Sequence, residues 1–122
     1  MAPRTVSSLL TMLSDTKVTR AGKLVGGTTP ADNLLMRGIT LDFDSVKWFI
    51  EEIMDKYADL FTCNYHVMKD MHMFHLRHGL DWKWSIFLQA CLEAMVHTIQ
   101  GLDSETTVSD HTMTLMVPLN EA

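Results

Sequence analysis

The segment Trp82–Gln100 constrains the fold of this chain more than any other part of the sequence. Its residues are apolar on nearly every face of a helix, and only Ser85, Gln89 and Glu93 form a polar row. Such a helix has to be buried on most of its sides. Asp81 precedes it and is a suitable N-cap. In a chain of 122 residues only one element can hold that position, so the sequence predicts a single domain, residues 1–122, around this helix.

Composition and charge exclude several kinds of partner. Apolar residues make up 47% of the chain, which argues against a disordered protein. The formal net charge is -5, and the Lys and Arg residues are scattered along the sequence. Proteins that bind nucleic acid or an anionic membrane usually carry a basic patch. We therefore expect neither of these partners.

The ends of the sequence and its cysteines predict a cytoplasmic protein. The start, MAPRTVSSLL, lacks the long apolar stretch of a signal peptide. No apolar run approaches the ~20 residues that cross a bilayer, so no transmembrane anchor is expected. Cys63 and Cys91 do not form a CxxC pair. We expect both to be reduced thiols in an intracellular chain.

The spacing of apolar residues predicts further helices around the central one. Between residues 45 and 61 they recur at i, i+3, i+4 and i+7, the clearest amphipathic pattern in the chain. Residues 64–77, rich in Met and His, are predicted to form another helix, ended by Gly79. Shorter helices are predicted over residues 6–13 and 31–41.

Two segments are predicted to be less regular. Residues 17–30 contain Gly22, Gly26 and Gly27, so they are predicted to form a flexible loop. Residues 104–118 are predicted to be a last helix that stops at a proline. Their four threonines lower the helix propensity, however, and leave a strand open.

No arrangement of residues in the sequence supports an enzyme. Ser85 lies in an apolar helix without a GxSxG turn, and Cys91 lies in the most apolar segment, where a thiol is inert. The stretch GKLVGGTT lacks the order of a phosphate-binding loop. We therefore expect no catalytic residue and no cofactor.

Five potential metal ligands are grouped in the sequence: Cys63, His66, His72, His75 and His78. Zinc prefers such ligands, and helical spacing would bring some of them together. Histidines that step by three drift around a helix, however, and no second cluster is present. Polar helix positions are the favoured interpretation, no metal ligand is assigned, and a zinc-binding regulator stays open as an alternative.

The segment HLRHGLDWKWSIFLQACLEAMV resembles the first homology region of the Bcl (B-cell-lymphoma-two) apoptosis regulators. Residues 79–82, Gly-Leu-Asp-Trp, match the Gly-Val-Asn-Trp of that region, which precedes an apolar central helix. Upstream, Leu34 and Gly38 fit the Leu-xxx-Gly core of the third homology region. The resemblance covers residues 34–99, over half of the chain.

The chain departs from the family pattern at several positions. Lys83 and Trp84 stand where the family has Gly and an Arg that pairs with the Asp of a bound death-motif helix. Ile39 replaces the Asp of the third region, and no second homology region follows. Such shortened, diverged members resemble viral survival proteins more than cellular ones.

The resemblance implies an all-α, Bcl-like helical bundle around the central helix. It implies an inhibitor of apoptosis, viral in origin, that sequesters the death-motif helix of pro-apoptotic Bcl-family proteins in the host cytoplasm, and it leaves room for association with mitochondria through those partners. Helix-in-groove binding buries apolar residues of the ligand along one face. Carried over by position, the groove would be lined by Leu41, Phe49, Met71, Phe74, His75, Lys83, Trp84 and Phe87.

A second interpretation is a small homo-oligomeric helical interaction protein, because an exposed apolar surface also favours self-association. Ten methionines are many for this length, and methionine is over-used at adaptable binding surfaces. A homodimer is compatible with either interpretation.

Overall fold

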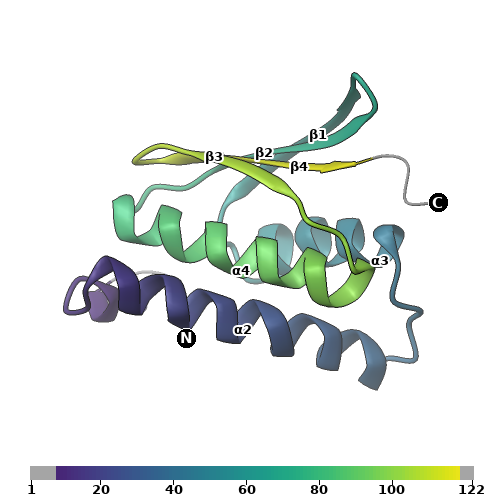
Figure 1. Cartoon of the computed structure of the whole chain (residues 1–122), viewed down its shortest axis with the longest axis horizontal. Coiled ribbons are helices and arrows are strands. Elements are labelled where there is room, and N and C mark those ends of the chain that lie inside the picture. The colour runs from purple at the N-terminus through teal and green to yellow at the C-terminus, as the bar shows by residue number, and fades with distance from the viewer. Residues whose placement is uncertain (1–7, 119–122) are drawn as a thin grey trace.

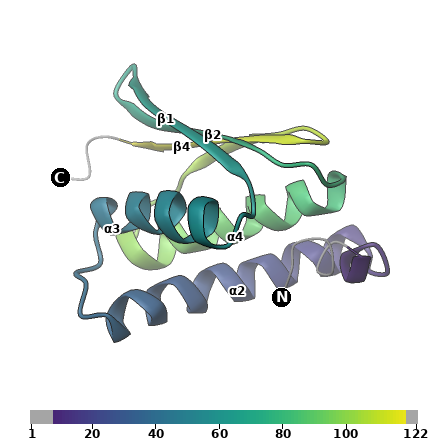
Figure 2. The ribbon, with the colours of Figure 1, turned by 180° about the vertical axis from the view of Figure 1, so that it is seen from behind.

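The computed structural model describes residues 8–118, in which a four-stranded antiparallel sheet has its helices on one side (Figure 1). In chain order the elements are α2 (Asp15–Met36), α3 (Phe43–Trp48), the π-helix η1 (Phe49–Tyr57), β1 (Thr62–Met68), β2 (Met71–Arg77), α4 (Trp82–Gln100), β3 (Glu105–Val108) and β4 (Thr112–Pro118). The strands lie in the order β1-β2-β4-β3. α4 runs between the sheet and α2, and α3 and η1 lie beside α4 beneath the sheet (Figures 1 and 2).

The prediction of a buried central helix is confirmed by α4. Its buried residues cover most of its circumference, and Trp84, Leu88 and Leu92 are almost fully inaccessible to solvent. The Asp81 side chain accepts a hydrogen bond from the backbone N–H of Trp84 at 3.3 Å, so Asp81 is the N-cap as predicted. Gly101, with a φ of 69°, ends the helix in the left-handed conformation that favours glycine.

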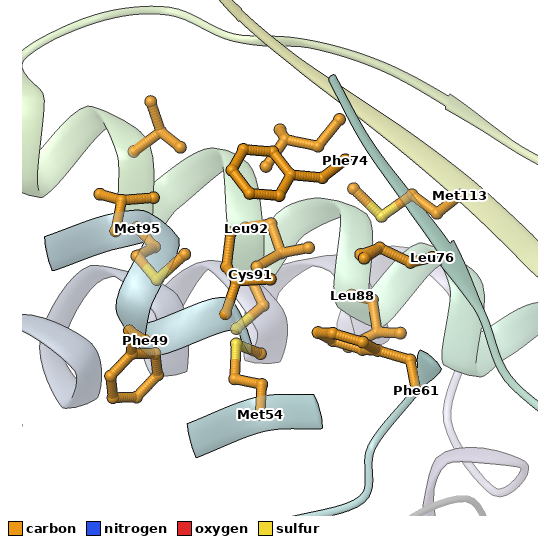
Figure 3. Packing of buried hydrophobic residues seen from close by; sticks show 14 of the residues in the cluster. Phe49, Met54, Phe61, Phe74, Leu76, Leu88, Cys91, Leu92, Met95 and Met113 are labelled. Atoms are coloured by element: carbon orange, nitrogen blue, oxygen red, sulfur yellow. The ribbon is translucent and has the colours of Figure 1, made fainter. Parts of the chain in front are cut away.

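The predicted all-α, Bcl-like bundle is wrong, because a sheet rather than a layer of helices covers one side of α4. Phe74 and Leu76 of β2 and Met113 of β4 pack over α4, and residues of η1 pack beside it (Figure 3). The chain therefore has a mixed α/β architecture with a four-stranded antiparallel sheet. The Gly-Leu-Asp-Trp turn that carries the resemblance does precede a central helix. That helix packs against a sheet on one side, whereas the resemblance implied helices all around it.

Residues 64–77 lie mostly in the β1–β2 hairpin and not in the predicted helix. Phe74 and Leu76 point to the core, while Met73 and His75 are partly exposed, which is the period of two that a strand requires. The two residues of the turn, at positions 69 and 70, have φ values of 52° and 64°. A type I′ hairpin turn needs this conformation and usually places Asn or Gly there. The sequence has Lys and Asp instead, so it carries no clear turn signal.

Residues 17–30 lie inside the 22-residue helix α2 and do not form the predicted flexible loop. A Cβ on Gly22 would lie 2.5 Å from the carbonyl oxygen of Phe87, and one on Gly26 would lie 1.9 Å from that of Cys91. These glycines let two helix backbones approach closely. These glycines therefore serve close packing of α2 against α4 and do not make the segment flexible. The positions of glycines in a sequence do not distinguish a packing role from a flexible loop.

The remaining element predictions are met in part. The amphipathic pattern at residues 45–61 corresponds to α3 followed by η1, which ends at Tyr57. Of residues 104–118, most lie in the β3–β4 hairpin, so the strand interpretation is correct and the helix is wrong. Residues 31–36 are the end of α2 rather than a separate helix. Residues 8–10 are helical, and residues 6 and 7 of the predicted first helix lie outside the described part.

Across residues 8–118, none of the helices combines the length and the hydropathy that a membrane span requires.

Candidate functional site

The structure separates the residues that were predicted to line one groove. Phe49, Phe74 and Trp84 are buried in the core, with 6%, 0% and 1% of their surface exposed. Trp84 stacks on Phe87 with ring centroids 5.5 Å apart, and its Nε1 donates to the backbone oxygen of Leu60 at 3.4 Å. These three side chains therefore belong to the hydrophobic core and do not line an open groove.

The other predicted groove residues lie in different places. Met71 and His75 are on the face of the sheet that points away from the helices. Leu41 is half-buried against the core. The Lys83 ammonium donates to the backbone oxygen of Leu13, so it is occupied within the chain and is not placed to meet the carboxylate of a ligand.

The predicted alternative of a zinc site is not supported by the geometry. Cys63 and His72 lie on the helix-facing side of the hairpin, whereas His66 and His75 lie on the opposite side. His78 is buried beyond the end of β2. Within residues 8–118, no three His, Cys, Asp or Glu residues are grouped so that they could hold a metal ion.

Neither cysteine is suited to act as a nucleophile. Burial raises the pKa of Cys91 to about 12, and burial together with the nearby carboxylates of Glu51 and Asp55 raises the pKa of Cys63 to about 12. Both thiols are therefore protonated at neutral pH, and a protonated thiol is a poor nucleophile.

The buried His78 and Ser85 resemble a base–nucleophile pair, with 2.7 Å between His78 Nε2 and Ser85 Oγ. The backbone N–H of Leu80 donates to His78 Nδ1 at 3.1 Å, so Nδ1 carries no proton and the neutral ring has its proton on Nε2. The ring then donates to Ser85 and cannot accept its proton. Ser85 Oγ itself donates to the backbone oxygen of Asp110 at 3.1 Å and is fully buried. The network ties α4 to the β3–β4 turn.

A second polar cluster anchors α3 beneath the β1–β2 hairpin. The hydroxyl of Tyr65 lies 2.6 Å from His72 Nδ1, and the His72 ring stacks on Phe43 with centroids 3.6 Å apart. The Lys47 ammonium lies over the Tyr65 ring at 4.7 Å and pairs with Glu51 at 2.8 Å. Each of these groups is engaged by a neighbour from another element, as expected for a structural contact.

The surface that remains is the side of the sheet that faces away from the helices, over which no described element lies (Figures 1 and 2). We call it the open face. Strand alternation and the pairing register assign to it Thr62, Asn64, His66, Met68, Met71, Met73, His75, Arg77, Glu105, Thr107, Thr112, Thr114, Met116 and Pro118. Among these residues, Arg77 and Glu105 are the only Asp, Glu, Lys or Arg side chains.

One half of the open face is hollowed and polar. The hollow has a volume of about 520 Å³, and its lining comprises Thr62, Asn64, His75, Leu76, Arg77, Thr112, Met113 and Thr114. His75 Nδ1 lies 3.1 Å from the Thr114 hydroxyl at the edge of this hollow.

The other half of the open face is apolar. Met73 lies opposite Met116, and Met71 lies opposite both Met68 and Pro118. Of these side chains, Met68 is 45% exposed. Solvated sheet faces usually carry polar side chains, so a group of methionines there is the clearest sign of a binding surface.

The sequence predictions included Met71 and His75 but missed Met73, Arg77 and Met116. The signal that could have found them is the alternation of buried and outward positions along residues 71–77. Methionine and histidine fit a helix as well as a strand, so this alternation is hard to see without the structure.

Comparison with models of protein families, with curated proteins and with solved structures gives no match for this chain.

Proposed function

We propose that this chain is a non-enzymatic interaction module that pairs with a second copy of itself through the open face. The observation that carries the proposal is the group of neighbouring methionines on an uncovered sheet, Met68, Met71, Met73 and Met116. Exposed apolar patches of this kind mark interaction sites. The chain as a whole has a net charge of -5, so two copies repel each other except where their surfaces are nearly neutral.

The charges of the open face favour a second copy as its occupant. Arg77 lies at one end of β2, next to Thr112 of β4, and Glu105 lies on the edge strand β3, next to Met116. The two charges are opposite in sign, and they lie on different strands and at different heights along the sheet. A two-fold axis can bring the Arg77 of each copy to the Glu105 of the other, as a symmetric interface requires. The methionines are then buried between the two sheets.

The size of the open face predicts a weak dimer. Four strands spaced by about 4.8 Å, three of them seven residues long at about 3.3 Å per residue, give a plan of at most roughly 19 by 23 Å, or about 440 Å². This area is smaller than the roughly 800 Å² per partner that a standard stable interface buries. We therefore expect an equilibrium between monomer and dimer that depends on concentration.

Sedimentation equilibrium of charge variants tests the pairing. Arg77→Glu places two acidic residues against each other across the interface, so the dimer should weaken by tenfold or more. The double variant Arg77→Glu/Glu105→Arg restores opposite charges and should recover most of the association. Arg20→Glu, an equal change of charge at an exposed position of α2, is the matched control and should be neutral. A wild-type chain that stays monomeric at every concentration, or a double variant without recovery, would contradict the proposal.

The death-motif function implied by the Bcl resemblance has no support in this geometry. It requires a groove between helices, and the residues predicted for that groove are divided between the core and the open face. Calorimetric titration with a panel of death-motif peptides provides the comparison. We expect no saturable heat, and tight binding of one peptide would replace self-pairing as the function. The cytoplasmic location remains a prediction from the sequence.

A further inference from the structure

Polar side chains from three strands form two neighbouring rows in the hollow of the open face. Across β1, β2 and β4, the pairing register gives one row of Thr62, Arg77 and Thr112 and a second row of Asn64, His75 and Thr114. The two rows lie two residues apart along each strand, so they share one side of the sheet. All six residues line the hollow of about 520 Å³. Small-molecule sites usually have volumes of about 300–1,000 Å³, so the hollow has room for a small ligand.

The charge of the hollow is positive. Arg77 is the one Asp, Glu, Lys or Arg residue among those that line it. Within residues 8–118, no carboxylate lies within ion-pair distance of the Arg77 guanidinium. Glu105, the other charged residue of the open face, lies opposite Met116 and outside the two rows. The hollow therefore presents a positive charge that no described acidic side chain neutralises, which suits an anion and not a metal cation.

The groups around this charge are able to donate hydrogen bonds. A guanidinium has five N–H donors, a side-chain amide has two, and a threonine hydroxyl has one. The side chains of Arg77, Asn64 and Thr62 form no hydrogen bond with another residue of the described part, 8–118. The hydroxyls of the two threonines on β4 are instead engaged within the chain. The unused donors therefore lie together on β1 and β2.

We propose that the hollow binds the phosphate group of a small organic phosphate monoester, with Arg77 as its main ligand. The planar fork of an arginine matches a phosphate or a carboxylate with two parallel hydrogen bonds. A phosphate monoester has three terminal oxygens and a charge of about −1.5 to −2 at neutral pH, so it can also accept from Asn64 and Thr62. A carboxylate has only two oxygens and a single charge. The rest of the hollow accommodates the organic part of the ligand.

The exposure of the site sets the expected strength of binding. Arg77 and Asn64 are both exposed, so water competes for their hydrogen bonds and the affinity should be modest. In the proposed dimer the same guanidinium meets Glu105 of the second copy. The inference shares this residue with the proposed function but does not depend on self-pairing, because a single chain supplies the whole site.

NMR titration of the full chain with phenyl phosphate tests the site. The protein is kept at a dilution at which sedimentation shows a monomer, so failure of self-pairing and failure of this site are distinct results. We expect the side-chain N–H signals of Arg77 and Asn64 to shift along one saturable curve. Benzoate, with the same ring and a carboxylate, should bind at least tenfold more weakly. Inorganic phosphate should shift the same signals with lower affinity, because it fills only part of the hollow.

Charge variants separate a built site from general attraction of an anion. Arg77→Gln should weaken the binding of phenyl phosphate at least tenfold. Arg20→Gln removes the same charge from an exposed position of α2 and should bind as the wild type does. Both substitutions are at exposed positions, so circular dichroism should show the native fold in each.

Three results would overturn the assignment. The first is the lack of a saturable shift with phenyl phosphate, and the second is unchanged binding by Arg77→Gln or an equal loss in Arg20→Gln. The third is a benzoate or inorganic phosphate affinity equal to that of phenyl phosphate, because the site would then not select an organic phosphate monoester.

Discussion

Gly26 shows how a single missing side chain sets the distance between α2 and α4. A Cβ at this position would lie 1.9 Å from the backbone oxygen of Cys91, which belongs to the neighbouring helix and cannot turn aside. The adjacent Gly27 differs, because a Cβ there would meet only the Thr98 hydroxyl, at 3.7 Å. Two neighbouring glycines of one helix therefore have different roles, and only the first is required by packing.

This difference predicts opposite effects of the same substitution. Gly26→Ala forces α2 away from α4, so the free energy of unfolding should fall by about 3 kcal/mol or more. Gly27→Ala adds helix propensity without a clash and should raise it by up to about 1 kcal/mol. Urea unfolding followed by circular dichroism measures both variants. Equal midpoints for the two would show that the close contact does not exist.

His78 makes the stability of the fold depend on pH. Burial, together with the nearby His111, lowers the pKa of His78 below its ordinary value of about 6.5. The unfolded chain then takes up a proton at a higher pH than the folded chain does. The stability contributed by the neutral ring is therefore complete above pH ~6.5 and is lost as the pH falls below that value.

A comparison of unfolding at pH 7.5 and 5.5 checks the role of His78. The loss of stability on acidification should be smaller in His78→Gln than in the wild type, because the variant has no buried group to protonate. His97→Gln, which changes an exposed histidine of α4, should behave as the wild type does. An identical pH dependence in His78→Gln would place the titrating group elsewhere.

At the scale of elements, the polar row of α4 is the docking edge for the β3–β4 hairpin. Gln89 Nε2 donates to the Thr106 hydroxyl at 2.9 Å, and that hydroxyl donates to Glu93 at 2.5 Å. One turn earlier, Ser85 donates to the backbone oxygen of Asp110. Ser85, Gln89 and Glu93, spaced by four along α4, thus mark the side of the helix on which the β3–β4 hairpin packs.

Removing the shared hydroxyl tests this docking. Thr106→Val leaves Gln89 and Glu93 without their partner in a partly buried place, which should lower the free energy of unfolding by about 1–3 kcal/mol. Thr107→Val, the next residue of β3 on the open face, should change it by no more than about 0.5 kcal/mol. Thermal unfolding of both variants measures the difference. Equal losses would mean that the row does not hold the hairpin.

The elements that could be predicted from the sequence are those with a strong local signal. The apolar character of Trp82–Gln100 and the cap at Asp81 define α4 without reference to other elements. The β1–β2 hairpin has no such signal, because its turn is Lys69-Asp70. The glycines of α2 could not be interpreted from the sequence, because their meaning depends on a helix more than sixty residues away. The residues of the open face could not be predicted either, because they depend on the pairing of both hairpins in one sheet.

At the scale of the whole molecule, the central helix is covered by α2 on one side and by the sheet on the other (Figures 1 and 2). The fold needs only one face of the sheet for its core, as is common in antiparallel sheets. The second face is left free, and there the chain places methionines, histidines and threonines, with Arg77 and Glu105 as its charged residues. The surface proposed for self-pairing is therefore this free face and not the surroundings of α4, where the resemblance placed a groove.

The most direct measurement is NMR of the methionine methyl groups in a dilution series of the chain. We predict that the methyl signals of Met68, Met71, Met73 and Met116 shift with concentration along a single binding curve. The signals of Met12 and Met36, which are exposed elsewhere, and of the buried Met54 and Met95 should not move. Shifts confined to Met12 or Met36, or no shift of any methionine, would contradict self-pairing through the open face.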